Sequence, residues 1–175
     1  VGRHEERKGL STLLEAVEIL YRKHKSRVTC HIIGHGPDSE RLREKYADPE
    51  RFRWHGQVSE VEKLSRMRDA TAFVAPALRG ESFGVVLLEA MAASTVVIAS
   101  DIPGYRNVAT HGVDALLVPP GDAMALASCL REVLADDSVR DELVTKGLET
   151  ATSMSMDRLA GLYVDRYRMV LNSPT

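Results

Sequence analysis

Two carboxylates lie eight residues apart, Glu81 inside a short loop that contains two glycines and Glu89 in the run that follows it. Glu81 lies in the polar loop 79–84, and Glu89 lies in the apolar run 85–93. The run predicts a helix that is apolar almost all round, and such a helix is buried. Because charged side chains are seldom fully buried without a partner, Glu89 must serve a purpose there.

The start of this predicted helix is suited to an anion. The first N–H groups of a helix have no acceptor inside it, so those of Ser82, Phe83 and Gly84 are available to a phosphate. Eight residues of helix span about 12 Å, a length similar to that of a nucleotide-sugar. The stretch thus offers carboxylates for hydroxyl groups at both ends and anion donors between them. The alternative is that Glu89 takes part in a core ion pair and the glycines form only a turn.

The segment G-E-S-F-G-V-V-L-L-E-A-M-A-A, residues 80–93, resembles the glutamate-x7-glutamate signature of retaining glycosyltransferases of the two-Rossmann-domain type, glycosyltransferase family 4. The resemblance implies that Glu81 binds hydroxyls of the transferred sugar, that Glu89 binds those of the ribose, and that anomeric configuration is retained. The family usually has glycine where this chain has Ser94, so we expect the serine to crowd the turn after the helix.

A second motif supplies positive charge. Residues 2–9, G-R-H-E-E-R-K-G, follow a predicted strand end, and ligands of open parallel sheets bind at the carboxyl ends of strands. By position alone Arg3 and Lys8 could equally belong to an ordinary surface loop. The motif resembles the family pattern G-R-x4-K-G, which implies that both residues bind the donor diphosphate and join Glu81 in the catalytic set. The resemblance also implies that Gly2, Val58 and Val85 bind the donor, and that the segment 102–106 forms a short turn and helix beside it.

The sequence contains no D-x-D motif and no cluster with metal-ligand spacing, so we expect neither a metal nor another cofactor. The charge of a departing nucleoside diphosphate would then be stabilised by Arg3, Lys8 and the helix start at Gly84.

The base-binding end is expected at Glu60 and Lys63. A carboxylate can accept from the adjacent N1–H and N2–H donors of guanine, whereas uracil would turn a carbonyl oxygen toward it. The alternative is that Glu60 only stabilises a helix start, where Ser59 and Glu62 predict a capping box. The segment G-Q-V-S-E-V-E-K, residues 56–63, is similar to bacterial phosphatidylinositol mannosyltransferases, which use GDP-mannose and have an acidic residue and a lysine at the same spacing.

Composition fits one soluble globular domain: 175 residues, 44% hydrophobic and 27% charged. A formal net charge of −2 argues against general nucleic-acid binding. Cys30 and Cys129 have no C-x-x-C spacing and are expected to be reduced thiols of a cytosolic protein. No run of about 18 apolar residues predicts a transmembrane segment.

The order of the predicted elements is strand, helix, strand throughout, which indicates an α/β fold. We expect a Rossmann-like parallel sheet of five or six strands with helices on both faces. The expected strands lie near 28–33, 52–55, 72–75, 96–99 and 115–118. The expected helices lie near 10–21, 39–46, 61–68, 85–93, 123–135, 138–148 and 156–171, with Asp122 capping the helix at 123.

The opening Val1-Gly2-Arg3 reads as the end of a strand. The resemblance implies that residues 1–175 form the C-terminal nucleotide-sugar-binding half of a two-domain (GT-B) enzyme, and that the N-terminal acceptor-binding domain is absent from this chain. The expected whole protein is a retaining, metal-independent hexosyltransferase that moves mannose from GDP-mannose to a phosphatidylinositol lipid. It would be cytoplasmic and peripheral on the inner face of the membrane, and this chain alone would be inactive. Two alternatives stay open: a sugar-nucleotide epimerase of the same architecture and a non-catalytic nucleotide-binding module.

Overall fold

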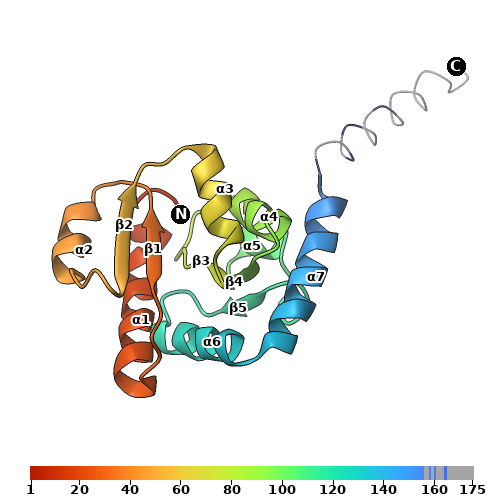
Figure 1. Cartoon of the computed structure of the whole chain (residues 1–175). Helices are drawn as coiled ribbons and strands as arrows, with labels where there is room; N and C mark the ends of the chain where they lie inside the picture. Colours follow the sequence, from red (N-terminus) through yellow and green to blue (C-terminus); the bar gives the residue numbers. More distant parts are fainter. Residues whose placement is uncertain (156–157, 159, 161–163, 165–175) are drawn as a thin grey trace, which may run out of the picture.

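The strands form two parallel sheets in the computed structural model, which describes residues 1–155, 158, 160 and 164 (Figure 1). Strand β1 (Cys30–Ile33) pairs with β2 (Phe52–Gly56). The second sheet has the order β3 (Ala72–Ala75), β4 (Val96–Ser100), β5 (Leu116–Val118). Both sheets are parallel and the strands alternate with helices, which confirms the predicted Rossmann-like α/β fold.

The expected single sheet is wrong, because β1 and β3 do not pair. The segment after Val1 instead lies beside β1. Its Gly2 N–H donates to the carbonyl of Ile33 at 3.0 Å, and its His4 N–H donates to the carbonyl of His35 at 3.3 Å. A narrow pocket lined by Ile33 and Val74 separates the two sheets.

The helices lie close to where the sequence predicts them. They are η1 (Glu6–Lys8), α1 (Leu10–His24), α2 (Ser39–Lys45), α3 (Glu60–Arg68), α4 (Val85–Ala92), α5 (Pro103–Arg106), α6 (Ala123–Ala135) and α7 (Asp137–Ser153). Ser59 and Asp122 cap α3 and α6 as expected, because their side chains accept from the N–H groups of Glu62 and Ala125. The helix expected at 156–171 lies outside the described residues, apart from three isolated positions. No helix in the described part of the chain has the length and apolar character needed to cross a membrane.

The core sits on both faces of the three-stranded sheet, and β4 is buried along its whole length. Because side chains alternate along a strand, Val97 packs with Leu87 of α4. Its neighbours Val96 and Ile98 pack on the opposite face against α1 and α6. Helices therefore cover both faces, as the sequence predicts. Cys30 and Cys129 are partly buried and are not joined to each other.

Helix α4 is buried on one side only, so the prediction of burial all round is wrong. Leu87, Ala90 and Met91 are buried, whereas Val85 is 59% exposed. The Glu89 side chain is itself partly exposed. Val85, the first residue of α4, thus lies at the molecular surface, beside the loop that precedes the helix.

Ser94 follows the end of α4 in a left-handed conformation, with φ of 59°. Its N–H donates to the carbonyl of Met91 at 3.0 Å. A left-handed backbone brings Cβ close to the following carbonyl, so this position favours glycine. The crowding expected at Ser94 therefore appears as backbone strain.

Candidate functional site

The loop 79–84 connects β3 to α4, and its carbonyl groups are held by side chains from two other segments. The guanidinium of Arg7, in η1, donates to the carbonyl of Gly80 at 3.1 Å. The side-chain amide of Asn107 donates to the carbonyl of Ser82 at 3.3 Å. Arg7 and Asn107 are 100 residues apart in the sequence, so the loop is fixed by tertiary contacts rather than by its own turn.

Helix α5 packs directly against the same loop. A Cβ on Gly104 would lie 1.8 Å from the carbonyl oxygen of Glu81, so only glycine fits at this contact. Gly84 has φ of 87°, and a Cβ there would lie 2.9 Å from the ring of Tyr105. These two glycines let the loop and α5 approach each other closely, and they fix the backbone on which Glu81 stands.

The N–H groups at the start of α4 are left without acceptors. Among the described residues, no hydrogen bond is donated by the N–H groups of residues 82–86, while the Leu87 N–H donates to the carbonyl of Gly84. Unpaired N–H groups at a helix start carry partial positive charge and are suited to an anion. The arrangement can therefore bind a phosphate group without a metal.

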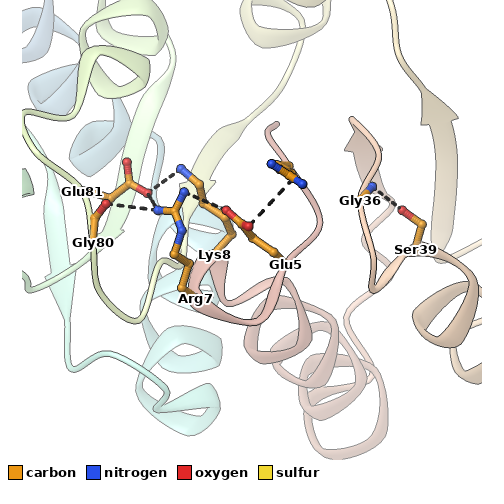
Figure 2. A network of polar contacts seen from close by, with 8 residues as sticks. Glu5, Arg7, Lys8, Gly36, Ser39, Gly80 and Glu81 are labelled. Atoms are coloured by element: carbon orange, nitrogen blue, oxygen red, sulfur yellow. Dashed lines mark hydrogen bonds and ion pairs between the residues drawn. The ribbon is translucent and has the colours of Figure 1, made fainter.

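Glu81 is paired with two cations (Figure 2). Lys8 Nζ donates to Glu81 Oε1 at 2.5 Å, and Arg7 Nη1 lies 3.5 Å from the same oxygen. The Glu81 side chain is 14% exposed, so this carboxylate is largely shielded from water by its partners. Tyr105 lies beneath the loop, and the pKa of its phenol is raised by burial and by the nearby Glu81 charge.

Lys8 reaches Glu81 because η1 packs closely against the segment that follows β3. Gly9 ends η1 with φ of 66°, and a Cβ there would lie 1.9 Å from the carbonyl oxygen of Pro76. The Leu78 N–H donates to the carbonyl of Arg7 at 2.8 Å. Glycine in the motif K-G thus permits the contact that brings residues 7 and 8 to the loop.

Lys63 joins the other two predicted carboxylates. Its Nζ lies 2.7 Å from Glu60 and donates to Glu89 at 3.0 Å. Burial alone would lower the pKa of Lys63, but the hydrogen bonds that Lys63 donates to Glu60 and Glu89 outweigh burial and raise it. The Lys63 side chain is 13% exposed and that of Glu60 is 80% exposed. Glu89 therefore has an ion-pair partner, as the alternative interpretation requires, but its side chain is 32% exposed, so the pair is not enclosed in the core.

Gly2 and Arg3 line an open hollow of about 750 Å³, together with the loop Gly34-His35-Gly36-Pro37, Glu40 and Gln57. The narrow pocket between the sheets, of about 60 Å³, brings Arg3 and Lys8 to one wall and Val86 of α4 to another. Val58 lies in the short connection from β2 to α3. Most of the Arg3 side chain is exposed, and its nearest carboxylate is that of Glu5 at 3.9 Å.

The sequence-predicted residues therefore gather into two contacting groups, Lys8 with Glu81 and Lys63 with Glu60 and Glu89. Residues 82–85 lie on the loop and helix start, Gly2 and Arg3 line the two pockets, and Val58 stands in the connection from β2 to α3. Phe83 and Val85 both present exposed side chains beside the free N–H groups. In the described residues no group of three or more His, Cys, Asp or Glu side chains is arranged to hold a metal ion.

Sequence reasoning assigned no role to Arg7, Gly104 and Asn107, which position the loop. The sequence did contain one indication that Arg7 could belong to the site, because Arg7 precedes Lys8 in the basic motif 2–9. The segment 102–106 was expected beside the site, but nothing in its residue types indicated that Gly104 would contact Glu81. Such contacts depend on tertiary approach, which spacing along the chain does not encode.

The sequence of the chain is similar to those of known glycosyltransferases. Residues 1–150 match the family described as glycosyl transferases group 1. The chain is 39% identical over 175 residues to the phosphatidyl-myo-inositol mannosyltransferase of Mycobacterium leprae, covering 99% of this chain and 46% of that protein.

Two solved structures are similar to the fold of this chain. Sucrose-phosphate synthase from Thermosynechococcus elongatus superposes with a TM-score of 0.83 and 30% identity, covering 98% of this chain and 44% of that one. HepE from Anabaena, solved in complex with UDP-glucose, superposes with a TM-score of 0.75 over 87% of this chain and 42% of that one; at 21% identity it shows the fold alone. The chain thus spans less than half the length of these three proteins.

Proposed function

The chain belongs to the glycosyl transferases group 1 family, and on this premise we propose that it is the nucleotide-sugar-binding half of a retaining hexosyltransferase. The observation that carries the proposal is the row of free N–H groups at residues 82–86, with a paired carboxylate at each end. This order of charges matches the order of groups in a nucleotide-sugar: sugar hydroxyls, diphosphate, ribose hydroxyls.

In the proposed complex the diphosphate lies on the start of α4. The N–H groups there, together with Arg3 and Lys8, stabilise the negative charge that develops as the bond from sugar to phosphate breaks. Lys8 now hydrogen-bonds Glu81, and it can turn toward a phosphate oxygen when the donor binds. The departing nucleoside diphosphate is then stabilised without a metal ion or another cofactor.

The two carboxylates orient the ends of the donor. Glu81 accepts from hydroxyls of the transferred hexose, and Glu89 accepts from the ribose while Lys63 holds it in place. Carboxylates make strong charge-assisted hydrogen bonds to hydroxyls, which suits them to this task. Gly2, Val58, Ser82, Phe83 and Val85 complete the surface that contacts the donor.

The transferred sugar is mannose and the acceptor a phosphatidylinositol lipid, both supported by the 39% identity to the mycobacterial phosphatidyl-myo-inositol mannosyltransferase. The donor is GDP-mannose. Glu60, held by Lys63, accepts from the guanine edge. The acceptor site belongs to the N-terminal domain of the whole protein, which works in the cytoplasm, peripheral on the inner face of the membrane. Since transfer requires the acceptor about 3 to 3.5 Å from the reacting carbon, this chain alone transfers nothing.

The test is product analysis with GDP-mannose, using this chain and the whole protein in parallel with phosphatidylinositol vesicles. We expect α-linked mannolipid from the whole protein only, with the configuration of the donor retained. Epimerised nucleotide-sugar formed without acceptor would instead indicate an epimerase. Unchanged nucleotide-sugar binding after Glu81→Ala would indicate a non-catalytic module, and transfer by this chain alone would overturn the assignment of the acceptor site.

A further inference from the structure

Arg7 makes three contacts around the loop, more than any residue that the sequence assigned to that end of the site (Figure 2). Its Nη2 lies 2.7 Å from Glu5, its Nη1 donates to the carbonyl of Gly80 at 3.1 Å, and the same nitrogen lies 3.5 Å from Glu81. A guanidinium presents its donors in a fixed planar fork, so it can hold several acceptors in one geometry.

The contacts of Arg7 differ from those of Lys8 in one respect. Lys8 has Glu81 as its partner in this structure and must serve the diphosphate once the proposed donor binds. Arg7 is anchored by Glu5 and by a backbone carbonyl, and neither of these groups is required by the donor. When Lys8 turns to the phosphate, Arg7 remains as the cation beside the Glu81 carboxylate.

We propose that Arg7 is a positioning residue, which holds Glu81 ready for the sugar of the donor while the diphosphate occupies Lys8. The proposal deepens the proposed function and rests on it. Arg7 fixes the backbone of Glu81 through Gly80 and keeps a positive charge beside its carboxylate. Its contribution therefore falls on recognition of the sugar and not on recognition of the nucleoside diphosphate.

A merely structural role would have a different signature. If Arg7 only stabilised the loop, its loss would displace the N–H groups at residues 82–86 together with Glu81. Affinity for the nucleoside diphosphate and for the nucleotide-sugar would then fall by the same factor. The ratio of the two affinities separates positioning of Glu81 from general support of the loop.

The experiment is calorimetric titration of GDP and of GDP-mannose into the 175-residue chain, comparing wild type with Arg7→Gln and Arg7→Lys. Arg22→Gln is the control, because Arg22 is an exposed arginine that pairs with Glu18 within α1. We expect Arg7→Gln to weaken the binding of GDP-mannose at least about fivefold and the binding of GDP less than about twofold, as for loss of one charge-assisted contact. Arg7→Lys keeps the charge but not the planar fork, so its affinity for GDP-mannose should lie between those of wild type and Arg7→Gln. The affinities of Arg22→Gln should match those of wild type.

Equal losses for both ligands, or no loss for either, would overturn the role of Arg7 while leaving the proposed function intact. Wild-type chain that binds neither ligand would overturn the proposed function, and the role of Arg7 with it. Circular dichroism and thermal unfolding of each variant establish that it folds. Should Arg7→Gln fail to fold, Arg7→Lys is compared with wild type instead, and the ratio of the affinities for GDP-mannose and GDP decides whether Arg7 positions Glu81.

Discussion

Gly104 lies against the carbonyl oxygen of Glu81, so closely that a Cβ would come within 1.8 Å of it. The contact joins α5 to the loop 79–84, and it fixes the backbone at one end of the site. Because a carbonyl oxygen of the main chain cannot rotate away as a side chain can, any larger residue must displace the loop or the helix.

We therefore expect Gly104→Ala to weaken GDP-mannose binding at least about tenfold and to destabilise the chain by about 1 to 3 kcal/mol, as overpacking does. Calorimetry and urea unfolding measure the two effects. Gly112→Ala is the control: Gly112 has φ of 72° but open space around it, so alanine costs backbone strain without touching the loop. Loss of binding in both variants would mean that binding merely follows stability.

Ser94→Gly should stabilise the chain. Ser94 has φ of 59°, a conformation that costs a residue with a Cβ about 1 to 2 kcal/mol, whereas glycine adopts it freely. The greater backbone freedom of glycine in the unfolded chain offsets part of the gain, so we expect about 0.5 to 1 kcal/mol more unfolding free energy. A urea midpoint that is unchanged or lower would show that the turn is not strained.

Selection of guanine should depend on Glu60. Wild-type chain is expected to prefer GDP over UDP at least about tenfold, and Glu60→Ala should reduce that preference. Glu62→Ala is the matched control, since Glu62 lies in the same first turn of α3 but pairs with Arg66. If both variants lower the preference equally, the acids only support the helix start.

Stability should fall on mild acidification because of three histidines. Burial lowers the pKa of His4, His31 and His55, and Arg66 lowers that of His31 and His55 further. The unfolded chain, with an ordinary pKa of about 6.5, then binds more protons than the folded chain as pH falls, so stability is kept above that value and lost below it. Urea unfolding between pH 7.5 and 5.5 should show this fall, and His55→Gln should make it shallower. A fall of unchanged steepness in His55→Gln would exclude a contribution from this residue.

The fold could be predicted from the sequence wherever local pattern decides structure. The β-branched run at 96–99 predicted strand β4, and the spacing of apolar residues predicted helix α1. The capping residues Ser59 and Asp122 predicted the starts of α3 and α6. The division into two sheets could not be predicted. Whether β1 pairs with β3 depends on long-range geometry, which the pattern of residues along a strand does not contain.

The candidate site divides in the same way. Glu81, Lys8, Glu89, Lys63 and Glu60 stood out by type and motif, and the structure brings them into contact. Arg7, Gly104 and Asn107 act through backbone carbonyls of the loop, and carbonyl groups are common to every residue. Apart from the place of Arg7 beside Lys8 in the basic motif, nothing in residue type or spacing indicates which carbonyls need support, so these contacts had to be found in the structure.

In the proposed complex the free N–H groups of residues 82–86, with Lys8, bind the diphosphate of a nucleotide-sugar without a metal. The most direct measurement is titration of GDP-mannose into the chain in buffer containing EDTA, repeated with Lys8→Ala and with the exposed control Lys45→Ala. We predict binding in EDTA that Lys8→Ala weakens at least about tenfold and Lys45→Ala leaves unchanged. Binding that appears only when Mg²⁺ is added, or that Lys8→Ala does not weaken, would contradict metal-independent binding of the diphosphate at this helix start.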